Sequence, residues 1–111
     1  MFRNTPFNQP IGSWDVSNVT NMQSMLRTTP FNQDISDWDI RNVSDFNNFM
    51  ANSFALNPTN YSALLIQWVT LPPQSNITIH FGDAKYTTAA APAHNTLSTT
   101  YNWTITDGGP L

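Results

Sequence analysis

The sequence lacks cysteine and glutamate and has few charged residues of either sign. Without cysteine there can be no disulfide framework and no cysteine-based zinc site, so the fold must be stabilised by packing. Four residues are basic and seven are acidic, all of them aspartate, which gives a net charge of −3. Binding to nucleic acid requires a cluster of Lys and Arg that neutralises phosphates. The sequence contains no such cluster, and we expect no nucleic-acid partner.

Long apolar runs are missing as well. No stretch of apolar residues reaches the length of about 18 that a membrane-spanning helix needs, and residues 1–6 lack the apolar core of a signal peptide. We therefore expect no membrane span in these residues, and any export signal would lie outside them.

Aromatic and neutral polar residues supply what charge does not. Aromatic side chains make up 13% of the chain and charged residues only 10%, so the chain can build a core and we expect no extensive disorder. Asn, Thr and Ser account for 37 of the 111 residues, a composition that suits turns, caps and side-chain ladders. The length fits one domain, residues 1–111, with a single core.

One stretch of the sequence occurs twice, and position n of the first copy corresponds to position n + 24 in the second. Residues 7–19 read FNQPIGSWDVSNV and residues 31–43 read FNQDISDWDIRNV. A fixed period of this length indicates one structural unit that stacks on copies of itself. We expect two and a half such repeats over residues 1–54.

The same offset aligns residues 1–6, MFRNTP, with residues 25–30, MLRTTP, so the chain opens in the middle of a repeat. A stack of repeats needs a polar terminal unit to remain soluble, and an apolar half-unit does not provide one. We expect a self-association surface at the N-terminal coil that contacts another coil and that includes Met1, Phe2 and Phe7.

Two periodicities occur within each repeat. Apolar and polar residues alternate at 14–16 and 38–40, which predicts short half-buried strands. Apolar residues then recur every three or four positions across 19–26 and 43–50, which predicts one face of a short helix. Asn8 and Asn32 would satisfy backbone groups at the corners.

The period lengthens after residue 54. The spacing predicts a helix over about residues 60–69, a strand over 77–81, a second helix over 89–100 and a last strand over 103–106. We interpret residues 55–111 as C-terminal capping coils.

The pattern Phe-Asn-Gln-x-Ile-x-x-Trp-Asp-Val-Ser-Asn-Val-Thr-Asn-Met, followed by Met-Leu or Phe-Met, resembles the BspA-type leucine-rich repeats of bacterial, mycoplasmal and some viral surface proteins. The final Trp-Thr-Ile-Thr-Asp-Gly-Gly is similar to the segment that follows such repeats. The resemblance implies a leucine-rich-repeat-like solenoid of the α/β repeat class and a surface-exposed adhesive or structural role without catalytic residues. The second copy departs from the pattern in its outer surface, at Arg41, Asp45, Phe46 and Phe49.

The expected fold is a short solenoid with one narrow parallel sheet, helical arms on the opposite side and a C-terminal cap. If each coil contributes one strand, Asp15, Asp37, Asp39 and His80 share the outward face of the sheet. Like charges on neighbouring strands repel unless something compensates them. A cation or a basic group of a partner could do so, but Arg41, water or counterions would also suffice. A calcium site needs more oxygen ligands in a loop, so we expect no metal and no cofactor.

An enzyme is not expected. His80 and His94 are the only histidines, and neither lies in a motif with a nucleophile and an orienting acid. Asp37 and Asp39 on an open strand face would offer no pocket for glycoside chemistry.

The sequence favours two alternative functions. The first is an extracellular, cell-surface or virion-surface module, structural or adhesive, that stacks on upstream repeats or on another subunit through its N-terminal coil. The alternative is a module that binds a glycan or a protein on the acidic strand face.

Overall fold

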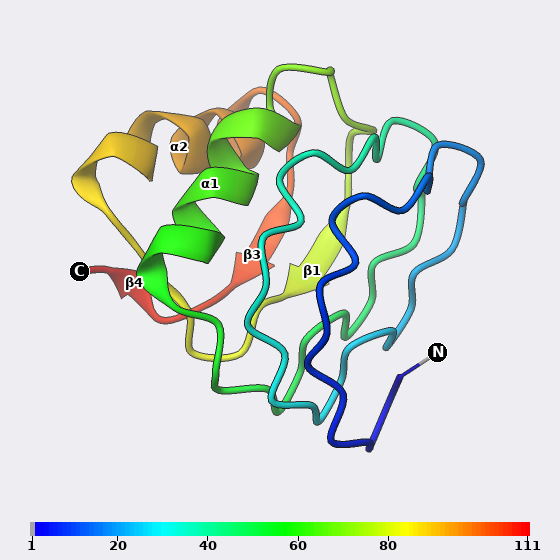
Figure 1. The fold of residues 1–111 in the computed structure, drawn as a ribbon. Coiled ribbons are helices and arrows are strands. Elements are labelled where there is room, and N and C mark those ends of the chain that lie inside the picture. Colours follow the sequence, from blue (N-terminus) through cyan, green and yellow to red (C-terminus); the bar gives the residue numbers. More distant parts are fainter. Residues whose placement is uncertain (1) are drawn as a thin grey trace.

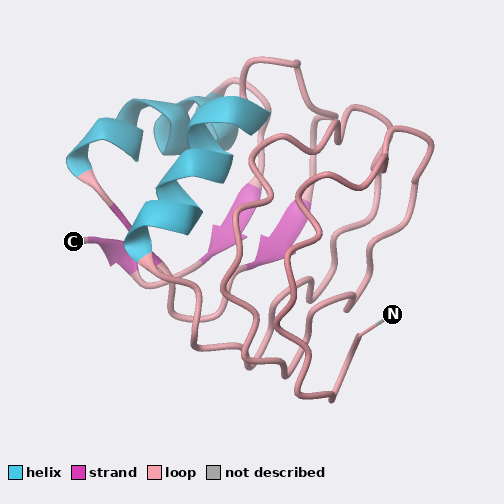
Figure 2. Ribbon diagram, in the orientation of Figure 1, coloured by secondary structure: helices cyan, strands magenta, loops and turns pink. Residues whose placement is uncertain are grey.

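The computed structural model describes residues 2–111 (Figure 1). The elements are α1 (Pro58–Trp68), β1 (Thr78–His80), β2 (Lys85–Tyr86), the 3₁₀ helix η1 (Thr88–Ala90), α2 (Ala91–Thr99), β3 (Thr104–Thr106) and β4 (Gly109–Pro110). Residues before α1 form turns and irregular segments, as Figure 2 shows by colour. The chain runs there in successive loops that lie side by side, and α1 and α2 contact each other beyond them.

Parallel backbone hydrogen bonds join the successive loops. We call residues 7–30 the first coil and residues 31–54 the second coil. Amides of the first coil donate to carbonyls of the second: Met22 to Asp45 at 2.7 Å, Ser24 to Asn47 at 2.9 Å, Leu26 to Phe49 at 2.9 Å and Thr28 to Ala51 at 3.0 Å. Phe2 and Asn4 donate in the same way to Met25 and Arg27. The repeat offset in the sequence is therefore also an offset between neighbouring backbones.

The row of paired segments continues into the C-terminal half. Phe46 forms a parallel bridge with Ile79, and Ile79 pairs with Ile105 between β1 and β3. Their side chains, with Met22 before them, point toward the core: Met22, Phe46 and Ile79 are buried and Ile105 is half-buried. Strands β2 and β4 form a second, separate parallel pair.

The predicted strands at 14–16 and 38–40 are wrong. The amides of Trp14 and Val19 bond to carbonyls three residues earlier, as do the equivalent amides of Trp38 and Val43. These segments therefore close turns within their own coil and leave the backbone pairing between coils to residues 20–28 and 44–51. The two small sheets also replace the single narrow sheet that the sequence predicts.

The predicted helices at 19–26 and 43–50 are wrong as well. Ser24 and Thr28 have φ angles of 54° and 56°, and Asn48 and Asn52, at the equivalent positions of the second coil, have similar values of 58° and 59°. A left-handed residue once per turn interrupts a right-handed helix. Alternate amides from Met22 to Thr28 bond to the second coil instead, so the spacing of apolar residues reflects inward-facing positions of a turning chain.

The predicted helices and strands after residue 54 are confirmed within a few residues. Helix α1 starts earlier than expected because Asn57 caps it, accepting from the Asn60 amide at 2.8 Å, and Pro58 occupies the first turn. The second predicted helix is divided into η1 and α2. No described helix is both long and apolar enough to span a membrane.

Side chains reinforce the contacts between coils. Trp38 donates its indole N–H to the carbonyl of Ile11 at 2.9 Å, and Trp68 donates in the same way to Ile35 at 3.2 Å. The predicted role of the corner asparagines is confirmed: Asn8 Oδ1 accepts from the backbone amide of Asn32 at 2.8 Å. Each coil thus satisfies polar groups of the next.

Candidate functional site

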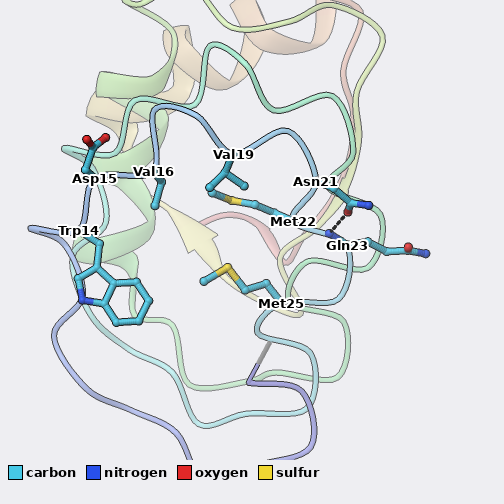
Figure 3. A pocket seen from close by; sticks show the side chains of 8 residues that line it. All are labelled: Trp14, Asp15, Val16, Val19, Asn21, Met22, Gln23 and Met25. Carbon is cyan, nitrogen blue, oxygen red and sulfur yellow. Dashed lines mark hydrogen bonds between the residues drawn. The ribbon is translucent and has the colours of Figure 1, made fainter.

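An apolar cavity of about 220 Å³ lies in the first coil (Figure 3). Trp14, Val16, Val19, Met22 and Met25 line it from all around the coil and point toward its centre. Asp15, Asn21 and Gln23 complete its lining. We call the five apolar residues the open end, because no complete coil of the described chain lies on them.

The equivalent positions of the second coil are covered by the first coil. Trp14 is 44% exposed, whereas Trp38, its counterpart, is 1% exposed. The Trp38 indole bonds to a carbonyl of the preceding coil, but the Trp14 indole has no acceptor within residues 2–111. The open end therefore lacks the cover that the first coil gives to the second.

The backbone at the open end is also incompletely bonded. The carbonyls of Asp45 and Asn47 accept from amides of the preceding coil, at 2.7 Å and 2.9 Å. Their counterparts in the first coil, the carbonyls of Asn21 and Gln23, accept no hydrogen bond from residues 2–111. Two carbonyls and one indole N–H thus face the side on which a further coil would lie.

The aromatic residues predicted for self-association lie beside the open end. Phe2 stacks on Phe7 with ring centroids 3.7 Å apart and contacts Trp14 at 5.9 Å. Phe7 in turn stacks in parallel over Phe31 at 6.1 Å. Both Phe2 and Phe7 are half-buried, and Met1 lies outside the described residues. The half-unit therefore lies beside the cavity and leaves Trp14 half-exposed.

The predicted acidic face is arranged differently from the expectation. Arg41 donates two hydrogen bonds to Asp39 and holds its pKa below the ordinary value. The Ser17 hydroxyl does the same for Asp15. Asp37 is exposed. The two bonded carboxylates thus have partners within their own turns.

His80 does not belong to the same row of residues as these aspartates. It lies in β1 opposite Thr106, and its Nδ1 accepts from the backbone amide of Gly82 at 2.9 Å. The expected alignment of His80 with Asp15 and Asp39 is wrong, because residues 21–23 and 45–47, and not the tryptophan segments, continue the row of β1. Within residues 2–111 there is no group of three or more acidic or histidine side chains placed to hold a metal ion.

A buried polar cluster was not predicted from the sequence. Asp107 accepts from the hydroxyl of Tyr61 at 2.5 Å and lies 3.0 Å from Nε2 of His94. Burial first, and then the hydrogen bond to Asp107 and its charge, raise the pKa of the Tyr61 phenol well above its ordinary value. The ring of His94 stacks on Tyr86. Tyr61 follows the apolar helical spacing and Asp107 begins a terminal turn, so only the three-dimensional arrangement reveals the cluster.

A family model described as "Mycoplasma protein of unknown function, DUF285" matches residues 1–90. The chain belongs to this family. The DUF285 match includes the open end, both coils, α1 and β1, and it stops before α2. No curated protein and no solved structure matches the chain.

Proposed function

We propose that this chain is a non-catalytic structural or adhesive module of a surface protein. In this proposal it is a short leucine-rich-repeat-like solenoid, residues 55–111 are its C-terminal cap, and a further coil of the same repeat docks on the open end. The resemblance to BspA-type repeats supports the surface role and the extracellular, cell-surface or virion-surface location. The contrast between Trp14 and Trp38 supports the docking and is the observation on which we rely most.

The exposed area explains why the open end favours a cover. A tryptophan side chain can bury up to about 250 Å², and the exposed 44% of Trp14 corresponds to roughly 110 Å². At about 25 cal/mol per Å², its burial contributes roughly 2 to 3 kcal/mol. Of the other apolar residues of the cavity, only the half-buried Val19 can add to this value, because Val16, Met22 and Met25 are already buried. Burial of the unbonded indole is favourable only if the occupant supplies an acceptor.

A coil of the same repeat supplies the required groups. Its isoleucine carbonyl would accept from the Trp14 indole, as the Ile11 carbonyl accepts from Trp38. Its amides equivalent to Met22 and Ser24 would donate to the carbonyls of Asn21 and Gln23. The coil belongs either to repeats that precede this segment in a longer polypeptide or to another copy of the chain.

An extended chain tests the proposal. In it, a second copy of residues 1–24 precedes residue 1, and the added copy carries Phe in place of its Trp14. We expect a higher melting temperature, and we expect the indole proton of the original Trp14 to become protected from solvent exchange in NMR spectra. The control is an extension of equal composition in scrambled order, which should change neither quantity.

Different results would contradict docking of a coil and self-association of the chain. Unchanged stability and an indole that still exchanges rapidly would refute docking of a repeat coil. Sedimentation velocity of the unextended chain at increasing concentration tests whether another copy can supply the coil. A monomer at every concentration would count against self-association and leave repeats of the same polypeptide as the source.

A further inference from the structure

A second cavity, of about 340 Å³, has polar walls. It is lined by Arg3, Gln23, Ser24, Arg27 and Asn48. Arg3 and Arg27 occupy equivalent positions of successive repeats, and the amide of Asn4 bonds to the carbonyl of Arg27 at 3.0 Å, so the two arginines lie on adjacent backbones. Both arginines line one cavity.

These two arginines differ from the other basic residues. Arg41 forms an ion pair with Asp39 at 2.7 Å, and Lys85 donates to the carbonyl of Gly108 at 3.1 Å. Arg3 and Arg27 form no ion pair within residues 2–111, and no aspartate lines the cavity. Neighbouring like charges repel, and an anion bound between them would remove this repulsion. In a chain of net charge −3, these two arginines thus place two unpaired positive charges at one cavity, and Lys85, the other basic residue without an ion pair within residues 2–111, does not line it.

The other walls suit a sugar. Gln23, Ser24 and Asn48 carry amide and hydroxyl groups that can both donate and accept hydrogen bonds, as sugar hydroxyls require. No aliphatic or aromatic residue is among the lining, so the cavity does not favour a lipid chain or an aromatic ring. Its volume exceeds what a single oxyanion needs and falls in the range of small-molecule sites.

We propose that this cavity binds an acidic saccharide. The two guanidinium groups bind its oxyanion, a carboxylate or a sulfate, and the neutral side chains bind the hydroxyls of the ring. Two cations are too few to bind a nucleic-acid backbone. The inference does not depend on docking of a coil at the open end, because only one of the five lining residues, Gln23, also lines the apolar cavity.

NMR titrations of the full chain test this proposal with four probes: glucuronic acid, glucose 6-sulfate, sodium sulfate and glucose. We expect saturable shifts of the Arg3 and Arg27 side-chain N–H signals with both acidic sugars and none with glucose. Binding of both acidic sugars, or of only one, identifies the oxyanion that the site accepts. Absence of a saturable shift with either acidic sugar would overturn the proposal.

Variants test the binding of the oxyanion and the binding of the sugar ring separately. Arg27→Gln and Arg3→Gln should each weaken binding of the acidic sugar about tenfold or more, and Arg41→Gln, which changes an arginine outside the cavity, should leave it unchanged. Gln23→Ala should weaken binding of the sugar but not of free sulfate. An equal loss in Arg41→Gln, or free sulfate binding as tightly as glucose 6-sulfate, would overturn the assignment. Each variant's amide spectrum verifies that it is folded.

Discussion

At the scale of single residues, the aspartates of this protein act mainly as turn residues. Asp15 and Asp39 accept hydrogen bonds from the backbone amides two residues later, and Asn21 and Asp45 do the same. A short side chain reaches that amide, whereas the longer glutamate does not hold the same geometry. The turn role, which Asp34 and Asp107 share, therefore offers a physical reason why these five of the seven acidic residues are aspartate. It also accounts for Asp15 and Asp39 without a ligand.

The two equivalent tryptophans should differ strongly in their contribution to stability. Trp38→Ala removes a buried ring and one of the two hydrogen bonds that the Ile11 carbonyl accepts, so we expect a loss of about 3–5 kcal/mol in the free energy of unfolding. Trp14→Ala removes a half-exposed ring without a hydrogen bond and should cost about 1 kcal/mol. Urea unfolding measures both. Equal losses would show that the open end is already stabilised as fully as the second coil.

Tyr61 should make the fold sensitive to alkali. Its pKa is raised in the folded protein, so the phenol is neutral there, whereas in the unfolded chain it ionises near pH 10. The stabilisation is complete below that pH and decreases as the pH rises above it. We expect Tyr61→Phe to lower stability by about 1–3 kcal/mol at neutral pH, because Asp107 loses a buried donor, and to make the alkaline decline shallower.

Denaturant unfolding between pH 8 and about 11 measures this effect. Tyr101→Phe serves as the control, because the Tyr101 hydroxyl forms no hydrogen bond with residues 2–111 and this ring is half-buried. It should retain the alkaline decline of the original chain. A decline of equal slope in Tyr61→Phe would contradict the assigned role of Tyr61.

At the scale of elements, the sequence predicts what local periodicity determines. Asn57 and Pro58 begin α1, and Ile77–Phe81 alternates around β1, so both elements are found from the sequence. The first two coils are different, because their amides bond across coils and left-handed residues such as Ser24 recur in each repeat. Inward-facing positions of such a coil imitate the spacing of a helix, and local patterns do not distinguish the two.

Predicting the candidate sites requires the register between coils, which local sequence patterns do not supply. The repeat correctly predicts which residues of neighbouring coils correspond, but the pairing row could not be assigned from local alternation. Local alternation therefore places His80 beside Asp39, whereas in the structure His80 lies in a row with residues 45–47. The 24-residue offset predicts that Arg3 and Arg27 lie on adjacent backbones. It does not predict that Asn48 lines the same cavity, because this depends on the conformation of the turn.

Close contact between coils makes Gly82 irreplaceable. Its φ is +67°, and an added Cβ would lie 1.8 Å from the carbonyl oxygen of Ser53 in the second coil. Gly109 has a similar φ of +82° but open space around it, so it isolates the cost of the backbone conformation. We expect Gly109→Ala to cost about 1 kcal/mol and Gly82→Ala more than about 3 kcal/mol in urea unfolding. Similar losses would show that the clash is relieved by a small backbone shift.

At the scale of the whole molecule, the two ends of the stack differ. At the C-terminal side, Trp68 of α1 is buried and stacks on Phe46 with ring centroids 5.6 Å apart, and α2 packs against α1. At the N-terminal side, of the residues that the structure describes, only residues 2–6 lie over the first coil, and Trp14 remains half-exposed. In a stack in which each unit contacts only its neighbours, the end with fewer contacts opens first.

Native-state hydrogen exchange should therefore reveal a gradient of stability along the stack. We expect the amides of Phe2 and Asn4 to exchange through local opening that costs only about 1–3 kcal/mol. The amide of Leu26, bonded to Phe49, should be more protected, and that of Met50, bonded to His80, should exchange only on global unfolding. Adding a copy of residues 1–24 in front should raise protection of Phe2 and Asn4 and leave Met50 nearly unchanged, because only the first coil gains a neighbour. Uniform protection from Phe2 to Met50 would mean that the molecule opens as one unit and that the N-terminal coil needs no partner.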